Sequence, residues 1–231
     1  MDTEIDGAQA LVKTLEDLNV EYIFGYSGGA AIPIFDALVT ATDKIKLIMS
    51  RHEQGAAHMA DGYARATGKP GVVLVTSGPG AANTITGLMT AHMDSVPIIV
   101  LTGQQIRPML GKDAFQEADI FNMTMPVTKH SYLVMETNDI PRITREAFHI
   151  ASTGRQGPVL IDLPKDVTSG TFSGSFDEPM KLGGYKQMLP PTKEDVMPIL
   201  EALKIAKRPV ILAGHGALLS GAAKNLRQLA E

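Results

Sequence analysis

IKLIMSRHEQGAAHMADGYARATG, residues 45–68, joins a short apolar run to a run of small residues with helical spacing. The segment from Ile45 to Met49 has the length and composition of a strand, and a helix is predicted over 53–67. Glu53 therefore lies at the mouth of a strand-to-helix turn. A carboxylate in that position is placed to meet a ligand.

Two simpler interpretations of this stretch must be weighed. Ser50 followed by Glu53 fits a capping box, in which the acidic side chain stabilises a helix start and has no catalytic role. A zinc site is a weaker prediction, because His52 and His58 are six residues apart and would lie on nearly opposite sides of the helix. Taken alone, the stretch favours the cap.

The rest of the first 165 residues alternates between predicted strands and helices. Tyr22 to Phe24 forms a strand that runs into the glycine-rich turn 25–29. Further strands are predicted over 71–76, 97–102, 127–134 and 158–162, and helices over 7–18, 32–39, 81–93, 116–122 and 139–153. This alternation is typical of an α/β fold with a doubly wound, mostly parallel sheet. Ligands bind at the carboxyl ends of such strands, where Glu53, the 77–80 turn and Gly103 would meet.

The periodicity fails between Pro164 and Pro191, where Gly, Ser, Pro and Thr dominate, and a linker is predicted over 166–191. A helix over 193–206, a strand from Val210 to Ala213 and a helix over 220–230 follow. One strand cannot make a sheet, so residues 192–231 are expected to be the start of a second α/β domain. We therefore expect the natural chain to continue beyond Glu231.

Composition excludes several classes of function. The chain has 231 residues, a formal net charge of −4 and no cysteine, which rules out disulfides, thiolate metal sites and cysteine nucleophiles. The weak negative charge gives no electrostatic case for nucleic acid or an anionic membrane. No apolar run is long enough to span a bilayer, and the acidic N-terminus does not resemble a secretory signal. A cytoplasmic protein is expected.

Two motifs suggest other functions. Residues 25–29, GYSGG, match the Gly-x-Ser-x-Gly elbow of serine hydrolases, with Ser27 as nucleophile. Against this, only one helix and one strand precede the motif, and no downstream histidine has a distinctive setting. Alternatively, the turn at 77–80 could open a helix that holds a cofactor in a non-catalytic binding module. Such a module would not need Glu53.

The order of five segments is more specific than any of them alone. These are FGYSGGA (24–30), RHEQGA (51–56), GYARATG (62–68), TSGPG (76–80) and DSVP (94–97). They resemble the pyrimidine-binding domain of thiamine-diphosphate enzymes of the acetohydroxyacid (acetolactate) synthase group. DAFQEAD (113–119) and GPVLIDLPKDV (157–167) are similar to segments of the catalytic subunit in that group.

The resemblance implies a role for individual residues. Glu53 matches the glutamate that hydrogen-bonds the aminopyrimidine ring of the cofactor, and it is the implied catalytic residue. The implied cofactor pocket also includes Tyr26, Gly28, Gly29, Pro79 and Asn83. The implied substrate channel includes Ala30, Phe115, Gln116 and Lys165. The implied FAD contacts are Arg155, Gly214 and Gly216.

The resemblance also implies a reaction and its partners. Pyruvate would be decarboxylated on thiamine diphosphate, and the two-carbon unit would join a second 2-oxo acid to give 2-acetolactate or 2-aceto-2-hydroxybutyrate. The family binds Mg²⁺ through a Gly-Asp-Gly motif, which is absent here, so the Mg²⁺ ligands would lie outside this chain. The glutamate serves a cofactor held by the facing subunit, which implies a homodimer or higher homo-oligomer. A regulatory small subunit is a further possible partner, and these residues alone are expected to be inactive.

Four positions, at three sites in the sequence, depart from the family pattern. Ser27 replaces a proline, which frees the backbone φ angle and restores an N–H donor in the cofactor turn. Gln105 and Ile106 replace Val-Pro near the substrate entrance. His215 replaces a glycine and adds bulk near the expected flavin.

Overall fold

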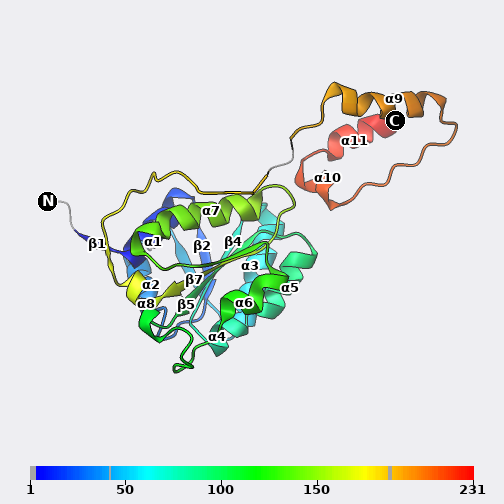
Figure 1. Ribbon diagram of the computed structural model, residues 1–231. Helices are drawn as coiled ribbons and strands as arrows, with labels where there is room; N and C mark the ends of the chain where they lie inside the picture. Colours follow the sequence, from blue (N-terminus) through cyan, green and yellow to red (C-terminus); the bar gives the residue numbers. More distant parts are fainter. Residues whose placement is uncertain (1–3, 42, 187–188) are drawn as a thin grey trace. The chain divides into compact units, whose positions relative to one another are not determined.

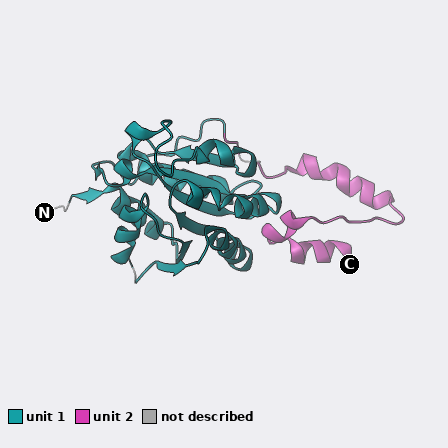
Figure 2. Cartoon of the chain, turned by 90° about the horizontal axis from the view of Figure 1, so that it is seen from below, with its two compact units in different colours: residues 1–184 teal, residues 185–231 magenta. Residues whose placement is uncertain are grey.

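The computed structural model describes residues 4–41, 43–186 and 189–231. The chain divides into two compact units, the first ending at Gly184 and the second running from Tyr185 to Glu231 (Figures 1 and 2). Among the described residues, no helix is both long and apolar enough to cross a membrane.

A six-stranded sheet forms the centre of the first unit (Figure 1). All neighbouring strands are parallel. Their order is β3 (Lys46–Met49), β2 (Tyr22–Gly25), β4 (Gly71–Val75), β5 (Ile98–Gln104), β7 (Val159–Pro164) and β6 (His130–Leu133). Every residue of β4, β5 and β7 is buried, as expected of parallel strands covered on both faces. The predicted doubly wound α/β fold is confirmed.

Helices pack on the sheet in two groups. One group contains α1 (Gly7–Asp17), α2 (Ile32–Val39), α7 (Ile140–Ser152) and α8 (Lys165–Thr168). The other contains α3 (Glu53–Thr67), α4 (Pro79–Ala82), α5 (Ile85–Met93) and α6 (Ile120–Thr124). Three short 3₁₀ turns, η1 (Arg107–Met109), η2 (Met125–Val127) and η3 (Thr137–Asp139), complete the connections.

Small residues bring α3 close to the sheet. Ala56, Ala57, Ala60 and Ala64 form one buried stripe of this helix against β4 and β5. A Cβ atom added at Gly71 would lie 2.2 Å from the carbonyl oxygen of Ala60, so only glycine permits this approach. The close packing fixes where α3 begins, and therefore where Glu53 lies.

Part of the predicted linker is folded into the first unit. Residues 165–168 form α8, and β8 (Thr171–Phe172) pairs antiparallel with β1 (Ile5–Asp6). Each of these strands has only two residues, too few for an alternating pattern to be visible in the sequence. The predicted 81–93 helix is also divided, into α4 and α5, and the helix predicted from 116 begins at Ile120, where Asp119 caps it.

The second unit consists of α9 (Lys193–Ile205), α10 (His215–Leu219) and α11 (Ala223–Ala230). None of its described residues is buried. The prediction of a strand from Val210 to Ala213 is wrong: this segment is not in a strand, and the exposed fractions of Val210 and Leu212 are 92% and 98%. A strand needs a neighbour for its backbone hydrogen bonds, and the described part of this unit contains no other strand.

Candidate functional site

The carboxyl ends of β2 and β4 adjoin at the point where the order of the strands reverses. From β2 the chain passes to β3 on one side and then to β4 on the other. The turn after β2 is bound to the strand end of β4, since Tyr26 N–H donates to the Leu74 carbonyl over 3.1 Å and Ala30 N–H donates to Thr76 Oγ1 over 3.3 Å. Ligands of open α/β sheets bind at such a switch point.

Glu53 is the first residue of α3, and it does not take part in a capping box with Ser50. The N-cap is His52, whose Nδ1 accepts from Gln54 N–H over 3.1 Å. The Ser50 hydroxyl instead donates toward the carbonyl oxygens of Gly25 and His52, at 3.2 and 2.9 Å. The interpretation of Glu53 as one half of a capping box is therefore wrong.

The Glu53 carboxylate is directed toward the turn after β4. Its exposed fraction is 9%, and its Oε2 atom accepts a hydrogen bond from Asn83 Nδ2 over 3.0 Å. Among the described residues, none donates a hydrogen bond to the other oxygen, Oε1. A Cβ atom at Gly80 would lie 3.2 Å from Oε1, so the glycine keeps this oxygen accessible.

A buried carboxyl with one oxygen fixed and one available can share a proton with a ring nitrogen of a ligand. The surrounding turns leave room for a flat heteroaromatic ring, because four of their residues, Gly28, Gly29, Gly78 and Gly80, carry no side chain. The chemistry of Glu53 and Asn83 therefore fits an aminopyrimidine.

A pocket of about 180 Å³ opens at the same edge of the sheet. Five segments of the chain contribute to it, and its lining residues are Gly29, Ala30, Ser77, Gln104, Gln105, Ile106, Phe115, Gln116 and Lys165. All four residues predicted to form a substrate channel are among them. Lys165 provides a cation at the first turn of α8, which suits an anionic ligand.

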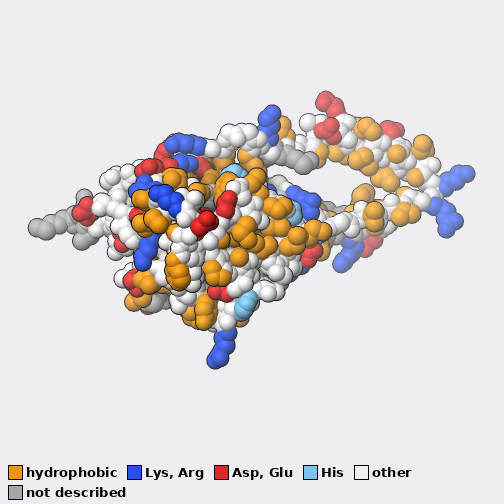
Figure 3. Space-filling model, turned by 60° about the horizontal axis from the view of Figure 1, so that its bottom comes forward, with side chains coloured by type: hydrophobic (Ala, Val, Ile, Leu, Met, Phe, Trp, Pro, Cys, Tyr) orange, Lys and Arg blue, Asp and Glu red, His pale blue; other side chains and the backbone are white. Residues whose placement is uncertain are grey.

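Figure 3 is turned so that the bottom of Figure 1, where α4 lies, comes forward. Hydrophobic side chains are exposed over much of the visible face of the first unit. Phe115 is the extreme example near the pocket, with an exposed fraction of 82%. Charged side chains lie between the hydrophobic ones, and exposed apolar side chains gathered on one face are typical of a binding surface.

A buried polar network next to the pocket was not predicted from the sequence. Asp162, on β7, accepts hydrogen bonds from Thr102 Oγ1 at 2.6 Å and Gln104 Nε2 at 2.9 Å. Burial raises the pKa of this carboxyl to about 7, and the two hydrogen bonds oppose part of that rise. An acidic residue inside the apolar run VLIDLP was the signal in the sequence.

Arg155, one of the three residues predicted to contact FAD, lies outside this cluster. Arg155 precedes β7 and its Nε donates to Ser95 Oγ over 2.8 Å, which places it at the amino edge of the sheet. Gly214 and Gly216 belong to the second unit, at the start of α10. Among the described residues, no group of three or more His, Asp or Glu side chains could hold a metal ion.

Ser27 lacks the surroundings of a hydrolase nucleophile. Its side chain is exposed, and in the described part of the chain no histidine hydrogen-bonds its hydroxyl. Its backbone is not among the described non-glycine positions with positive φ, whereas the elbow of hydrolases is a strained turn.

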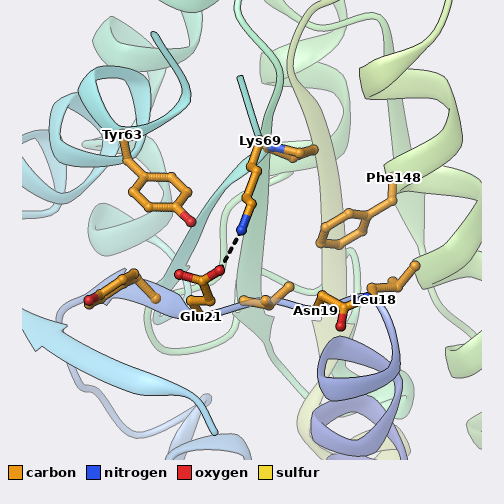
Figure 4. Close-up of a pocket in the computed structure, with 9 residues that line it drawn as sticks. Leu18, Asn19, Glu21, Tyr63, Lys69 and Phe148 are labelled. Carbon is orange, nitrogen blue, oxygen red and sulfur yellow. Dashed lines mark hydrogen bonds and ion pairs between the residues drawn. The ribbon is translucent and has the colours of Figure 1, made fainter. Parts of the chain in front are cut away.

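A second pocket, of about 170 Å³, lies at the start of β2 and just before β4, at the amino edge of the sheet. Tyr63 and Phe148 stand on either side of it, and Lys69 forms an ion pair with Glu21 between them (Figure 4). None of the predicted site residues lines it. Glu53, Asn83 and the residues of the predicted substrate channel lie instead at the carboxyl edge of the sheet.

Comparison with known proteins gives a family match for half of the chain. Residues 5–123 match the model of the thiamine pyrophosphate enzyme, N-terminal TPP binding domain. This range contains Glu53, Asn83 and both turns described above, whereas Arg155 and Lys165 lie outside it.

Similar curated proteins cover nearly all of the sequence. The chain is 47% identical over 228 residues to an acetolactate synthase large subunit of Mycobacterium tuberculosis, covering 99% of this chain and 37% of that protein. It is 46% identical over 230 residues to that of Haemophilus influenzae, covering 99% and 40%. The large subunit of Lactococcus lactis is 48% identical over 225 residues, covering 97% and 39%. The chain thus spans about two fifths of the length of these relatives.

Proposed function

The chain belongs to the thiamine pyrophosphate enzymes, and from this premise we propose that its protein is an acetolactate synthase. The proposed reaction decarboxylates pyruvate and joins the two-carbon unit to a second 2-oxo acid. The product is 2-acetolactate with pyruvate as acceptor and 2-aceto-2-hydroxybutyrate with 2-oxobutyrate. Both products serve the synthesis of branched-chain amino acids.

The observation that carries this proposal is the environment of Glu53: its carboxyl is buried, Asn83 binds Oε2, and Oε1 has no donor among the described residues. Thiamine diphosphate, when bound, supplies a carbon acid that can add to a 2-oxo acid and stabilise charge after decarboxylation. Glu53 Oε1 hydrogen-bonds the pyrimidine ring and holds a proton there, while Asn83 fixes Oε2. The buried position excludes water from this proton, which strengthens the interaction.

The turns around Glu53 bind and orient the rest of the ring. Tyr26, Gly28 and Gly29 form one side and Pro79 forms the other. Thr76 contacts the turn after β2, which holds the two sides at a fixed separation. The absence of a side chain at Gly29 and the single methyl of Ala30 leave room for the reacting part of the substrate.

The 180 Å³ pocket is the proposed substrate channel. Lys165 and the Gln116 side chain bind the carboxylate and carbonyl oxygens of a 2-oxo acid, and Phe115 covers its alkyl group. Gln105 and Ile106 occupy positions where the family usually has Val-Pro, so acceptor preference is expected to depend on these two side chains.

The remaining cofactors and partners are proposed from the resemblance to the acetohydroxyacid synthase group. We propose that Mg²⁺ binds through residues outside these 231, and that FAD contacts Arg155, Gly214 and Gly216. We also propose that the protein is cytoplasmic and forms a homodimer or higher homo-oligomer. A regulatory small subunit is proposed as a further partner. Tyr26, Ile48 and Met49 support self-association, because they are exposed apolar residues at the carboxyl ends of β2 and β3.

A product assay tests the proposed function. The protein as its gene encodes it is incubated with pyruvate, with and without added thiamine diphosphate and Mg²⁺, and 2-acetolactate is measured. Formation of 2-acetolactate only with thiamine diphosphate is expected. Cofactor binding without product would instead favour a non-catalytic cofactor-binding module.

Ser27→Ala serves as the control in the same assay. The substitution is expected to retain 2-acetolactate formation, because the Ser27 hydroxyl has no catalytic part in the proposed reaction. If the unsubstituted protein has an esterase activity and is labelled by an active-serine reagent, loss of both in Ser27→Ala would support the hydrolase alternative.

A further inference from the structure

The loop 111–118 forms one wall of the pocket and has an unusual backbone. Asp113 and Gln116 have φ angles of +52° and +55°, in the left-handed region that non-glycine residues avoid. Glu117 accepts hydrogen bonds from the N–H groups of Gly111 and Ala114 and closes the loop on itself. Such conformations persist only where surrounding contacts impose them.

Two glutamines at the end of β5 provide those contacts. Gln104 Nε2 donates to the Ala118 carbonyl over 2.9 Å, and Gln105 Nε2 donates to the Phe115 carbonyl over 2.6 Å. Gln104 Oε1 also accepts from the backbone N–H of Gln105 over 2.9 Å, so the Gln104 side chain fixes the backbone from which the Gln105 side chain extends. The orientation of Gln104 therefore determines where the loop lies.

Asp162 determines the orientation of Gln104. Its Oδ2 accepts from Gln104 Nε2 over 2.9 Å and its Oδ1 accepts from Thr102 Oγ1 over 2.6 Å. Its exposed fraction is 1%, and it does not line the pocket. Burying a carboxyl beside the centre of a sheet is costly, so a structural requirement for an acceptor is needed to explain it.

We propose that Asp162 is a positioning residue for the acceptor 2-oxo acid: through Gln104 it fixes the 111–118 loop, and with it Phe115 and Gln116 against the bound acceptor. This inference rests on the proposed function for its substrate, but its structural part does not. Among the described residues no hydrogen bond links Asp162 to Glu53, so the proposed role of Asp162 is in binding the acceptor and not in holding the proton at Glu53.

Paired substitutions at one position test the proposal in the protein as its gene encodes it. Asp162→Leu removes both acceptors at similar volume. Asp162→Asn is the conservative partner, because its amide oxygen can accept from Gln104 while its NH₂ donates to Thr102. Ser131→Ala is the control: it removes a buried hydroxyl of β6 whose hydrogen-bond partners among the described residues are Thr124 and Thr128, neither of which lines the pocket.

The first readout is kinetic. With 2-oxobutyrate as acceptor and saturating pyruvate, Asp162→Leu is expected to raise KM about tenfold with kcat changed less than about threefold, since a hydrogen bond to a buried charged or polar acceptor is lost. Asp162→Asn is expected to restore KM to within about twofold of the unsubstituted protein, and Ser131→Ala to leave it there. Equal loss of kcat in both Asp162 variants, with KM unchanged, would overturn the proposal.

The second readout needs no activity. Hydrogen exchange of the 111–118 amides is expected to be about tenfold faster in Asp162→Leu than in Asp162→Asn, whereas Ser131→Ala accelerates exchange near 124–131. Unchanged loop exchange in Asp162→Leu would refute the positioning role even if the protein forms no 2-acetolactate. If Asp162→Leu fails to fold, Thr102→Val removes the other hydrogen bond that orients the Asp162 carboxyl and leaves both side-chain bonds of Gln104 to Ala118 and Gln105 in place, so the same loop exchange decides.

Discussion

Two buried carboxyl groups of the first unit differ in how their oxygens are satisfied. Both oxygens of Asp162 accept hydrogen bonds within the protein, from Thr102 and Gln104. One oxygen of Glu53 is bound by Asn83, and the other has no donor among the described residues. Asp162 is therefore suited to hold structure, and Glu53 is suited to hold a ligand.

The raised pKa of Asp162 predicts a dependence of stability on pH. Because its pKa rises from 3.8 to about 7 on folding, the folded protein keeps a proton that the unfolded chain releases. The stability from the protonated carboxyl is complete below pH 3.8 and is lost progressively up to about pH 7. The slope is at most about 1.4 kcal/mol per pH unit, for one proton.

Thermal unfolding of the unsubstituted protein and Asp162→Asn over this range measures the effect. The amide does not titrate, so the difference in melting temperature between the two proteins should shift in favour of Asp162→Asn as pH rises from 4 to 7. A difference that stays constant across the range would contradict the raised pKa.

At the scale of elements, the sequence predicted what depends on local spacing. The helix from Glu53 to Thr67 and the central strands follow from the periodicity of apolar and small residues. The Gln104–Asp162 contact could not be predicted in this way, because its partners are 58 residues apart in the sequence. The capping box at Ser50 failed for a related reason: the Ser50 hydroxyl donates to the carbonyl oxygens of His52 and Gly25, and Gly25 lies on β2, 25 residues away in the sequence.

The turn after β4 offers a prediction at this scale. Gly78 has φ +57°, and a Cβ atom there would lie 2.3 Å from the carbonyl oxygen of Gln116. Gly78→Ala should therefore destabilise the protein by about 1–3 kcal/mol and displace the pocket loop. We expect a lower melting temperature and faster hydrogen exchange of the 111–118 amides in Gly78→Ala.

Gly62→Ala is the matched control. Gly62 is exposed in the middle of α3, with no atom within 4 Å of the added Cβ. The substitution should stabilise the protein by up to about 1 kcal/mol through helix propensity. Equal changes in the free energy of unfolding for Gly78→Ala and Gly62→Ala would show that the close approach of Gly78 and Gln116 does not affect stability.

At the scale of the whole molecule, the first unit presents its site at one edge of a rigid sheet. The order of the strands brings together residues from 26 to 165 that no local pattern connects. The exposed apolar residues at the ends of β2 and β3 lie at the same edge. Such an arrangement is consistent with a site that a second subunit completes.

Met49→Lys tests this association. Met49 is 49% exposed at the end of the edge strand β3, so lysine is tolerated in the isolated subunit but would be desolvated in an interface. The dissociation constant of the homo-oligomer, measured by sedimentation, should rise at least about tenfold, which corresponds to about 1.4 kcal/mol. Val39→Lys, at an exposed position ending α2, should leave it unchanged. Equal dissociation constants for Met49→Lys and Val39→Lys would contradict an interface at the end of β3.

In the proposed reaction, Glu53 shares a proton with the pyrimidine ring of thiamine diphosphate. Turnover of pyruvate to 2-acetolactate by Glu53→Gln tests it most directly. The amide oxygen can still accept from Asn83, so the fold and melting temperature should be retained, but kcat should fall by at least about 100-fold because the proton-sharing oxygen is lost. Turnover within about twofold of the unsubstituted protein would contradict the claim.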